Sequence, residues 1–394
     1  MEKQKICIIG GCLTGLTTAI ALSKLNIKID LISASNNSAN IKLNRTTAVS
    51  QSNYNFLKNL KITESLKNEF WPCSHMKLYS KNEKEKLIEI FEMNKIGKQK
   101  EQILYMFNNE IFIKHLIKII KKNKLITFKT QKKISKIINT GILKSVKFYD
   151  ENSHKYNLII VCTGSNSKLL KNIFYSDSFE HGYDEVSITT MLKHNSCSNN
   201  IARQIFLDDG ILALLPIANT KTSIVFSINK KFVNEYKKNK ENFFKNKIHY
   251  YAEYFLEKIK FNSKIEFNNL NFSIREKYFE DRVLLFGDVL HQVHPLAGQG
   301  FNMTLRDLVH LKKILSNKVS LGLDIGNSDT LSEFSNVTQP RNFVYSIGID
   351  FLKHSFSSEN YIAKNFRNKI ISDLNKNHFA KDIFYKLADE GFKF

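Results

Sequence analysis

Apolar residues in this chain occur as short continuous runs and as helically spaced series, which together predict strands alternating with helices. The first run is 6–9, followed by the turn GGCLTG at 10–15 and a helix-like apolar stretch at 16–22. A second run covers 29–32. A late run at 283–286 leads through a Pro/Gly loop into a helical series at 301–315. Short apolar strands that alternate with helices predict an α/β fold.

The segment 282–307 carries the most informative pattern. Asp288 follows the late apolar run, and ligands of an open parallel sheet collect beyond the carboxyl ends of its strands. A carboxylate there can accept hydrogen bonds from a polyol. Glycines in the next loop leave backbone N–H groups uncovered, and the following helix adds its positive end. We therefore predict a site for a phosphate or a delocalised anion, with a loop that contains Pro295, Gly298, Gln299 and Gly300.

The N-terminal segment predicts the strand, glycine turn and helix of a dinucleotide-binding unit, with a pyrophosphate at the helix N-terminus. Glycine is expected at the first, third and sixth turn positions, and the chain has Gly10, Cys12 and Gly15. The Cβ and sulfur of Cys12 should crowd the phosphates and lower affinity. The second strand ends at Ser33, where a carboxylate would ordinarily hold a ribose hydroxyl. Ser33 offers one hydroxyl and no charge.

Residues 287–307 resemble the signature of class A flavoprotein aromatic hydroxylases, specifically the branch that makes ubiquinone. The matching residues are a Gly-Asp pair, His-x-x-His-Pro, Ala-Gly-Gln-Gly-x-Asn and a final aspartate. The resemblance implies that Asp288 holds the ribityl chain of FAD and that the loop and helix start face the isoalloxazine ring. The implied FAD-binding residues are Gly10, Gly11, Cys12, Leu13, Thr14, Gly15, Ser33, Arg45, Asp288, Pro295, Gly298, Gln299, Gly300, Phe301 and Asn302.

Further matches to this family extend from residue 6 to about residue 391. Residues 45–50 resemble an Arg-x-x-Ala-Leu-Ser stretch whose arginine lies near the cofactor. Residues 156–167 resemble a strand and turn associated with flavin and nicotinamide, although Thr163 replaces the aspartate of that turn. Residues 104–116 carry the family's asparagine as Asn109. Residues 183–185, 202–206 and 212–216 resemble substrate-domain strands, with Glu185 in place of a glutamine.

The resemblance implies an α/β architecture of the para-hydroxybenzoate hydroxylase type. We expect a Rossmann-like FAD-binding domain, a mixed or antiparallel β-sheet substrate domain and C-terminal helices. The family plan assigns 1–69, 92–179 and 276–344 to the FAD-binding domain, 70–91 and 180–275 to the substrate-binding domain, and 345–394 to the C-terminal helical region. Residues 70–91 should contribute a pair of strands.

Composition is consistent with a large enzyme. A chain of 394 residues with 42% apolar content can bury a sizeable core and would normally form two or more units. The five cysteines show no C-x-x-C spacing and no accompanying histidine cluster, which favours a reducing compartment and predicts neither a zinc site nor a disulfide framework. The net charge of +22 comes mostly from dispersed lysines without a nucleic-acid motif, so we expect no nucleic-acid partner.

The first apolar stretch also resembles the central region of a secretory signal, since Lys3 and Lys5 precede it. Three glycines and the strand that follows favour the glycine-turn interpretation. Elsewhere, the longest candidate for a membrane span, 211–218, has only the length of a strand. We expect a cytoplasmic protein that can lie peripherally at the inner face of the membrane.

Two regions show apolar stripes flanked by lysines and predict amphipathic helices, one at 113–120 and one formed by Ile362, Phe366, Ile370, Phe379, Ile383 and Leu387. We expect these helices to pack on the domain core. In the alternative, the C-terminal helices touch anionic lipid, where each nearby Lys or Arg contributes on the order of 1 kcal/mol. A polyprenylated substrate would make that contact useful.

The resemblance implies a monooxygenase that hydroxylates a polyprenylated phenol or quinol in ubiquinone biosynthesis through a flavin C4a-hydroperoxide. It implies O₂ as a substrate, NAD(P)H or a protein as electron donor, and membership of a ubiquinone-biosynthesis complex as one option. Pro295 and His294 would border the peroxide site, but His291 and His294 are structural more often than catalytic, so no base is assigned. The alternatives are a flavin hydroxylase or epoxidase for another hydrophobic compound, and a degenerate lipid-binding or scaffolding subunit suggested by Cys12, Ser33 and Thr163.

Overall fold

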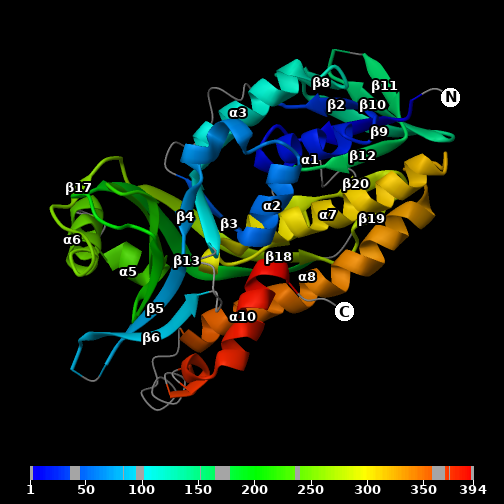
Figure 1. The fold of residues 1–394 in the computed structure, drawn as a ribbon. Helices are drawn as coiled ribbons and strands as arrows, with labels where there is room; N and C mark the ends of the chain where they lie inside the picture. The colour runs from blue at the N-terminus through cyan, green and yellow to red at the C-terminus, as the bar shows by residue number, and fades with distance from the viewer. Residues whose placement is uncertain are drawn as a thin grey trace.

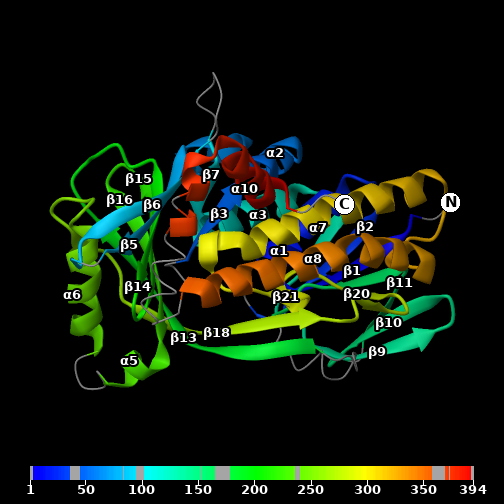
Figure 2. The ribbon, with the colours of Figure 1, turned by 90° about the horizontal axis from the view of Figure 1, so that it is seen from below.

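A computed structural model describes residues 3–35, 45–82, 84–94, 102–150, 152–164, 178–235, 240–356, 369–371 and 373–391. Its two large sheets lie at opposite ends of the molecule, and long helices run beside them (Figures 1 and 2). Two helices of the N-terminal half and one later helix pack around the smaller of these sheets. The larger sheet carries two helices on its outer side. The predicted α/β class is confirmed.

The six-stranded sheet has the order β19-β20-β12-β1-β2-β8 and is parallel except for the β19–β20 pair. Its inner strands are the continuous apolar runs of the sequence, as expected for strands that are covered on both faces. The predicted strands at 6–9, 29–32 and 283–286 are thereby confirmed. The strands are β1 (Lys5–Ile9), β2 (Lys28–Ile32), β8 (Ile126–Lys129), β12 (Leu158–Val161), β19 (Phe279–Glu280) and β20 (Val283–Leu285).

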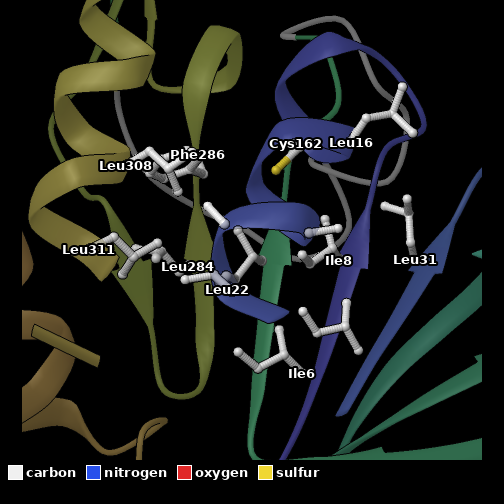
Figure 3. Close-up of a cluster of buried hydrophobic side chains, with 14 of the residues drawn as sticks. Ile6, Ile8, Leu16, Leu22, Leu31, Cys162, Leu284, Phe286, Leu308 and Leu311 are labelled. Atoms are coloured by element: carbon white, nitrogen blue, oxygen red, sulfur yellow. The ribbon is translucent and has the colours of Figure 1, made fainter. Parts of the chain in front are cut away.

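Helices α1 (Leu13–Ser23), α3 (Asn109–Lys122) and α7 (Gln299–Ser320) pack around this sheet. Figure 3 shows Leu16 and Leu22 of α1 among apolar side chains of β1, β20 and α7. Every residue labelled there is at most 5% exposed. The glycine turn before α1 and the loop before α7 are therefore both attached to helices of the same hydrophobic core. The stripe predicted at 113–120 is confirmed, because Leu116 and Ile120 are buried and Ile113 and Ile117 pack against the same core.

The nine-stranded sheet has the order β21-β18-β13-β16-β15-β14-β5-β6, with β17 paired to β13. Most pairs are antiparallel, and β14–β5 is parallel, so the mixed sheet expected for the second domain is present. The strand pair expected within 70–91 is β5 and β6. The strands are β5 (His75–Lys81), β6 (Leu87–Asn94), β13 (Ser178–Lys193), β14 (Ile201–Leu207), β15 (Gly210–Ala218), β16 (Lys221–Asn229), β17 (Lys260–Phe261), β18 (Glu266–Arg275) and β21 (His291–Gln292).

Side chains alternate between the two faces of this sheet, as the period of a strand requires. Leu212 and Leu214 of β15 pack with Phe244 and Ile248 of α6 (Lys240–Ala252) in the second core. Helix α5 (Lys230–Glu235) covers the same side. The intervening residues of β15, Ala213 and Leu215, face the opposite side, where a cavity lies.

A small sheet of order β3-β7-β4 joins the two halves, and a second small sheet of order β11-β10-β9 lies beside the parallel sheet. The first of these sheets is continued by α2 and the 3-10 helix η1. The bounds are β3 (Thr46–Ser50), β4 (Trp71–Cys73), β7 (Leu104–Asn108), α2 (Gln51–Asn59), η1 (Glu64–Glu69), β9 (Ile134–Thr140), β10 (Leu143–Phe148) and β11 (Ser153–Tyr156).

The C-terminal part contains α8 (Ser328–Phe356) and α10 (His378–Glu390). The expectation that the apolar stripe of the last helix packs on the core is wrong for the described residues. Phe379 is 75% exposed and Ile383 is 42% exposed, whereas Tyr385 and Asp389 form the buried face. The physical reason is that Asp389 bonds to the start of α2, which fixes the helix rotation. Residues 362 and 366 of the predicted stripe lie outside the described residues.

The expected domain limits at 91/92, 179/180 and 344/345 fall inside β6, β13 and α8 respectively. We therefore propose to keep each of these elements whole when the chain is divided, with α8 assigned to the C-terminal region. None of the helices in the described ranges combines the length and apolar content that crossing a bilayer requires.

Candidate functional site

The glycine turn between β1 and α1 is close-packed against β12. Gly10 has a φ of +133°, and a Cβ there would lie 2.5 Å from the carbonyl oxygen of Cys162. A Cβ on Gly15 would lie 1.9 Å from the carbonyl oxygen of Gly10. These two glycines bring the turn and the helix start together. No side chain caps α1 and no acidic residue lies in its first turn, so its positive end suits an anion.

The late strand places its carboxylate beside this turn. Gly287 lies against the side chain of Thr14, and the 3-10 helix η2 (Gly287–Val289) that holds Asp288 also packs on α7. Asp288 is exposed to solvent but surrounded by protein atoms, so it lies in a recess, which also includes Cys12 and Arg45. The surrounding protein raises the pKa of the Asp288 carboxyl group, while the charges of His291 and Arg45 act in the opposite direction. The two predicted motifs, at opposite ends of the chain, therefore meet at one site.

Two more predicted residues join this recess. Cys12 is exposed, and its pKa is raised by the surrounding protein and by the Asp288 charge, against the opposing effect of Arg45. Arg45 is exposed and donates a hydrogen bond of 3.2 Å to the side chain of Asn268. Gly11, Leu13 and Thr14 belong to the same turn and helix start. The recess thus contains a thiol, a carboxylate and a guanidinium next to a helix N-terminus.

The loop after β21 is held to the small sheet by Asn302. Its Oδ1 accepts hydrogen bonds from the backbone N–H of Ser50 (2.9 Å) and the amide of Asn53 (2.8 Å), and its Nδ2 donates to the carbonyl of Ala48 (3.0 Å). Since Asn302 is fully buried and engaged, its side chain positions the loop. Gln299 is likewise buried and accepts a hydrogen bond from Tyr345 at 2.8 Å.

Because the side chains of Asn302 and Gln299 are engaged within the protein, the backbone of the loop is the part that can contact a ligand. The 3-10 helix η3 (Leu296–Gly298) precedes α7, and Gly298 is the left-handed N-cap residue. Within the described residues the space beside Gly300 is open, with nothing within 4 Å of a Cβ placed there. Phe301 packs partly buried against the core. The start of α7 therefore presents backbone N–H groups and a positive helix end to a neighbouring ligand.

A cavity of about 80 Å³ adjoins this loop at Pro295 and Gly298. A single water needs about 10–15 Å³ of such space, so the cavity has room for an aromatic ring. Thr46 and Gln204 are the polar side chains among its lining, and the Oγ1 of Thr46 is buried with no hydrogen-bond partner among the described residues. The other lining residues are Ala48, Met76, Leu104, Met106, Ala202, Ala213, Leu215 and Val225.

Sequence reasoning did not identify these lining residues. The available signal was the alternation within 202–206 and 212–216, which places every second residue on the inner face. This alternation identifies the face of the sheet, but it does not show which residues on that face border the Pro295 loop.

A buried ionic cluster includes His294, the residue directly before Pro295. The Glu185 carboxylate is 3.0 Å from Nε2 of His294 and 3.1 Å from Nζ of Lys353, and all three residues are buried. Burial opposes ionisation of Glu185, but the hydrogen bonds and charges of His294 and Lys353 outweigh it and hold its pKa below the ordinary value. Glu185, which replaces the glutamine usual in the family, is thus paired with Lys353 of α8.

The two histidines of the motif both have carboxylate partners. Nε2 of His291 lies 3.2 Å from Asp307, which also accepts a hydrogen bond from Asn342 at 2.8 Å. In both histidines Nδ1 is buried, and the part of the chain that the structure describes offers it no hydrogen-bond partner. Neither histidine lines the cavity. The geometry therefore favours a structural role for both, and a phenol-activating base is not assigned.

Several expected residues lie outside the recess or have other bonds. Ser33 is buried, and its hydroxyl donates to the carbonyl of Ser35 at 2.9 Å. Asp30, the acidic residue of the same strand, bonds to Tyr156 at 2.7 Å and Lys5 at 3.0 Å. Thr163 follows β12, and its Oγ1 is buried with no partner within the described ranges. The family turn continues into 165–167, outside the described residues. Asn108 caps α3, whereas Oδ1 of Asn109 is buried without a partner.

Taken together, the arrangement suits an extended ligand with three chemical parts. A phosphate fits at the N-terminus of α1, a polyol beside Asp288 and a flat, electron-accepting ring at the N-terminus of α7. The apolar cavity adjoins the Pro295 loop and can hold a second ring next to the first. Such a site suits a reaction between a bound cofactor and a hydrophobic aromatic compound.

Comparisons with known proteins agree with this geometry. The family described as FAD binding domain matches residues 3–320. The protein "Ubiquinone biosynthesis monooxygenase COQ6, mitochondrial" of Dictyostelium discoideum is 26% identical over 94% of this chain and 88% of its own length. The frog (Xenopus tropicalis) protein of that name is 27% identical over 51% of each chain, so the match spans about half of its length. "Ubiquinone hydroxylase UbiL" of Rhodospirillum rubrum is 26% identical over 45% of this chain and 42% of its own.

Solved structures share the fold at low sequence identity. The p-nitrophenol 4-monooxygenase PnpA of Pseudomonas putida has a TM-score of 0.80 at 12% identity, with full coverage of both chains. The R204Q variant of HpxO from Klebsiella pneumoniae, solved with FAD, has a TM-score of 0.75 at 13% identity and covers 98% of this chain and 99% of its own. At such identity the likeness establishes the fold alone.

Proposed function

Because the chain belongs to the FAD-binding domain family, we propose that it is a monooxygenase that hydroxylates the aromatic ring of a polyprenylated phenol or quinol in ubiquinone biosynthesis. The observation that carries the proposal is the meeting of the Gly10–Gly15 turn with Asp288, next to a ring-sized apolar cavity at Pro295. The substrate class is supported by the printed names of the COQ6 and UbiL relatives.

The residues present fit FAD. The N-terminus of α1 would receive the pyrophosphate, Asp288 would accept hydrogen bonds from the ribityl chain, and the N-terminus of α7 would face the isoalloxazine. When bound, FAD supplies the two electrons with which O₂ yields one oxygen atom to the ring and one to water. Those electrons come from NAD(P)H or from a protein donor.

The protein's own contribution is positioning, electrostatics and exclusion of water. The positive end of α7 favours negative charge beside it, and Pro295 with the apolar side chains of the cavity keeps water from the reacting ring. Thr46 and Gln204 can hydrogen-bond a phenol hydroxyl, and the unpartnered Oγ1 of Thr46 would gain a partner. We propose these two residues as the groups that orient the substrate.

The proposed reaction is tested with purified, FAD-loaded protein, a reductant, a prenylated phenol and ¹⁸O₂. The expected product carries a single labelled oxygen on its ring. Unchanged phenol, despite oxidation of the reductant, would contradict hydroxylation of this substrate class. Lipid extraction of cells that lack the protein separates this reaction from one on another hydrophobic compound, because a ubiquinone precursor should accumulate.

Binding of FAD is expected to protect Cys12 from alkylation. Cys12 and Cys197 are the exposed cysteines, while Cys7, Cys73 and Cys162 are buried. A cofactor over the Gly10–Gly15 turn would cover Cys12 but not Cys197. Mass spectrometry of protein treated with iodoacetamide should show Cys12 labelling fall at least about tenfold when FAD is bound.

Cys197 provides an internal control, since its labelling should be the same with and without FAD. Equal loss of labelling at both cysteines would indicate a general change in the protein. Undiminished labelling of Cys12 at saturating FAD would contradict the assigned position of the pyrophosphate.

We further propose that α10 contacts an anionic membrane surface, where a polyprenylated substrate resides. Phe379, Ile383 and Phe384 are exposed on it, and the side chains of Lys376 and Lys386 are 76% and 64% exposed nearby. Exposed apolar side chains with adjacent lysines match a surface that is both apolar and anionic.

The double substitution Phe379→Ser, Ile383→Ser is expected to weaken binding to phosphatidylserine-containing vesicles by about tenfold in co-sedimentation. Ile142→Ser is the matched control, because Ile142 is 79% exposed on the turn between β9 and β10, away from α10 (Figure 2). Equal binding by all three proteins would contradict membrane contact and favour a ubiquinone-biosynthesis complex as the partner of this surface.

A further inference from the structure

A second, narrower cavity of about 20 Å³ adjoins the ring cavity. Met76 and Leu104 line both cavities and separate them. The ring cavity borders Pro295 and Gly298 of the loop. The narrow cavity borders the next loop residue, Gln299, and also Tyr385 and Ala388 of α10. The two cavities therefore share a wall at Met76 and Leu104, and the narrow one extends from the flavin loop to the C-terminal helix.

The narrow cavity has a lining suited to a hydrocarbon chain. Met76, Met93, Ile103 and Leu104 contribute apolar surface. Methionine side chains are unbranched and have three rotatable bonds, so they can change rotamer and widen a passage without moving the backbone. The polar residues at its edge have partners in the protein, because Asp389, Ser50 and Gln299 are all hydrogen-bonded. A bound chain would leave none of these three residues without a partner.

Helix α10 forms the outer wall of this cavity and is fixed at one end. The carboxylate of Asp389 accepts hydrogen bonds of 2.8 Å from the backbone N–H and the hydroxyl of Ser52. A residue remote in the sequence therefore caps the N-terminus of α2. The carbonyl of Ala388 accepts a hydrogen bond from Arg306 at 3.4 Å. This end of the helix is therefore tied to the FAD-binding half.

The other end of α10 lies along β6, where Phe384 meets Phe91 with ring centroids 6.1 Å apart. Figure 2 shows α10 beside β6, β7 and β3. Its outer side carries the exposed Phe379 and Ile383. A chain that leaves the narrow cavity between α10 and β6 would thus emerge at the apolar outer surface.

We propose that this passage, from Met76 and Leu104 to the underside of α10, binds the isoprenoid tail of the substrate while the ring occupies the larger cavity. The inference rests on the proposed function and adds a binding site for a second part of the same substrate. A tail held there would orient the ring toward the Pro295 loop. Its far end would reach the surface that contacts lipid.

The test compares two ligands on the FAD-loaded protein by equilibrium titration. One is a methoxyphenol without a tail, and the other is the same ring with a geranylgeranyl chain. The unmodified protein should bind the tailed compound about 100-fold more tightly, because several CH₂ groups become buried. Ala388→Phe fills the narrow cavity and should weaken binding of the tailed compound by at least about tenfold, with binding of the tailless compound within about twofold of the unmodified protein.

Three variants control the comparison. Ile142→Ser lies on an exposed turn outside the lining of both cavities and should bind both compounds as the unmodified protein does. Ala213→Phe narrows the ring cavity and should weaken binding of both compounds equally. Met93→Trp obstructs the passage from β6, so it replaces Ala388→Phe if that variant does not fold.

The outcomes separate failure of the passage from failure of the function. Two results would overturn the tail site: equal affinity of the unmodified protein for both compounds, or a loss of affinity that is the same for both compounds in folded Ala388→Phe and Met93→Trp. Either result would leave the proposed function standing, because the unmodified protein would still bind the ring. Failure of the unmodified, FAD-loaded protein to bind either compound would overturn the proposed function, and the tail site with it.

Discussion

Replacement of Glu185 by glutamine is expected to lower the free energy of unfolding by about 3 kcal/mol. The Glu185 carboxylate lies between His294 and Lys353, at 3.0 and 3.1 Å, in a buried cluster. An amide has no charge with which to compensate Lys353, and a buried charge without its partner is costly. Because His294 immediately precedes Pro295, the loop beside the cavity should also become less ordered.

Urea titrations measure this effect, and a double variant tests its cause. Lys353→Met removes the uncompensated charge, so Glu185→Gln with Lys353→Met should regain most of the stability lost in the single variant. Glu253→Gln is the matched control, because Glu253 pairs with His249 at the surface and such pairs contribute about 0–1 kcal/mol. A Glu185→Gln variant within about 1 kcal/mol of the unmodified protein would contradict the account of the cluster.

The difference between Glu185→Gln and the unmodified protein should depend on pH. The pKa of Glu185 is lower in the folded protein than its ordinary value, so its ionised form stabilises the fold. That contribution is complete above the ordinary glutamate pKa of about 4.3 and is lost as the pH falls through the lowered value. The two proteins should therefore approach equal stability in acid and differ most near neutral pH.

Replacement of Asp288 by alanine is expected to weaken FAD binding by about 100-fold. Asp288 presents its carboxylate in the recess beside the Gly10–Gly15 turn, where ribityl hydroxyls would donate to it. A hydrogen bond to a charged group contributes about 1.5–3 kcal/mol, so the loss of one such bond to FAD accounts for the weaker binding. FAD fluorescence titration of the desalted protein measures the affinity.

Protein stability separates this effect from unfolding. The pKa of Asp288 is raised by the surrounding protein, so the ionised carboxylate opposes folding at neutral pH in the absence of cofactor. Asp288→Ala should therefore be at least as stable as the unmodified protein while it loses FAD. Asp150→Ala, at an exposed turn before β11, should leave FAD affinity unchanged. An affinity within about threefold in Asp288→Ala would contradict the assigned contact.

The parts of the fold that the sequence predicted are those determined by neighbouring residues. The strands at 6–9 and 283–286 and the helices after them follow from apolar runs and glycine turns. The meeting of Asp288 with the first turn follows from the rule that parallel strands align their carboxyl ends. The resemblance added the identity of the cofactor, which spacing alone left at a phosphate or a delocalised anion.

The misplaced or missed features depend on contacts between distant segments. The exposed face of α10 was wrongly expected to be buried, because Asp389 caps α2 and turns Tyr385 inward. Lys353 became part of the cluster with Glu185 only through the packing of α8 on β13. No pattern within a single segment reports such pairings. Ser33 is a different case: it lies at the expected position of its motif, but a local bond to Ser35, two residues further on, engages its hydroxyl.

The proposed function requires that the Gly10–Gly15 turn and Asp288 together hold FAD. The most direct measurement is titration of purified, cofactor-stripped protein with FAD, followed by gel filtration and an absorbance spectrum. We expect flavin to co-elute with the protein at one FAD per chain and Asp288→Ala to elute without flavin. Folded, unmodified protein that takes up no flavin would contradict the account and would favour a scaffolding subunit.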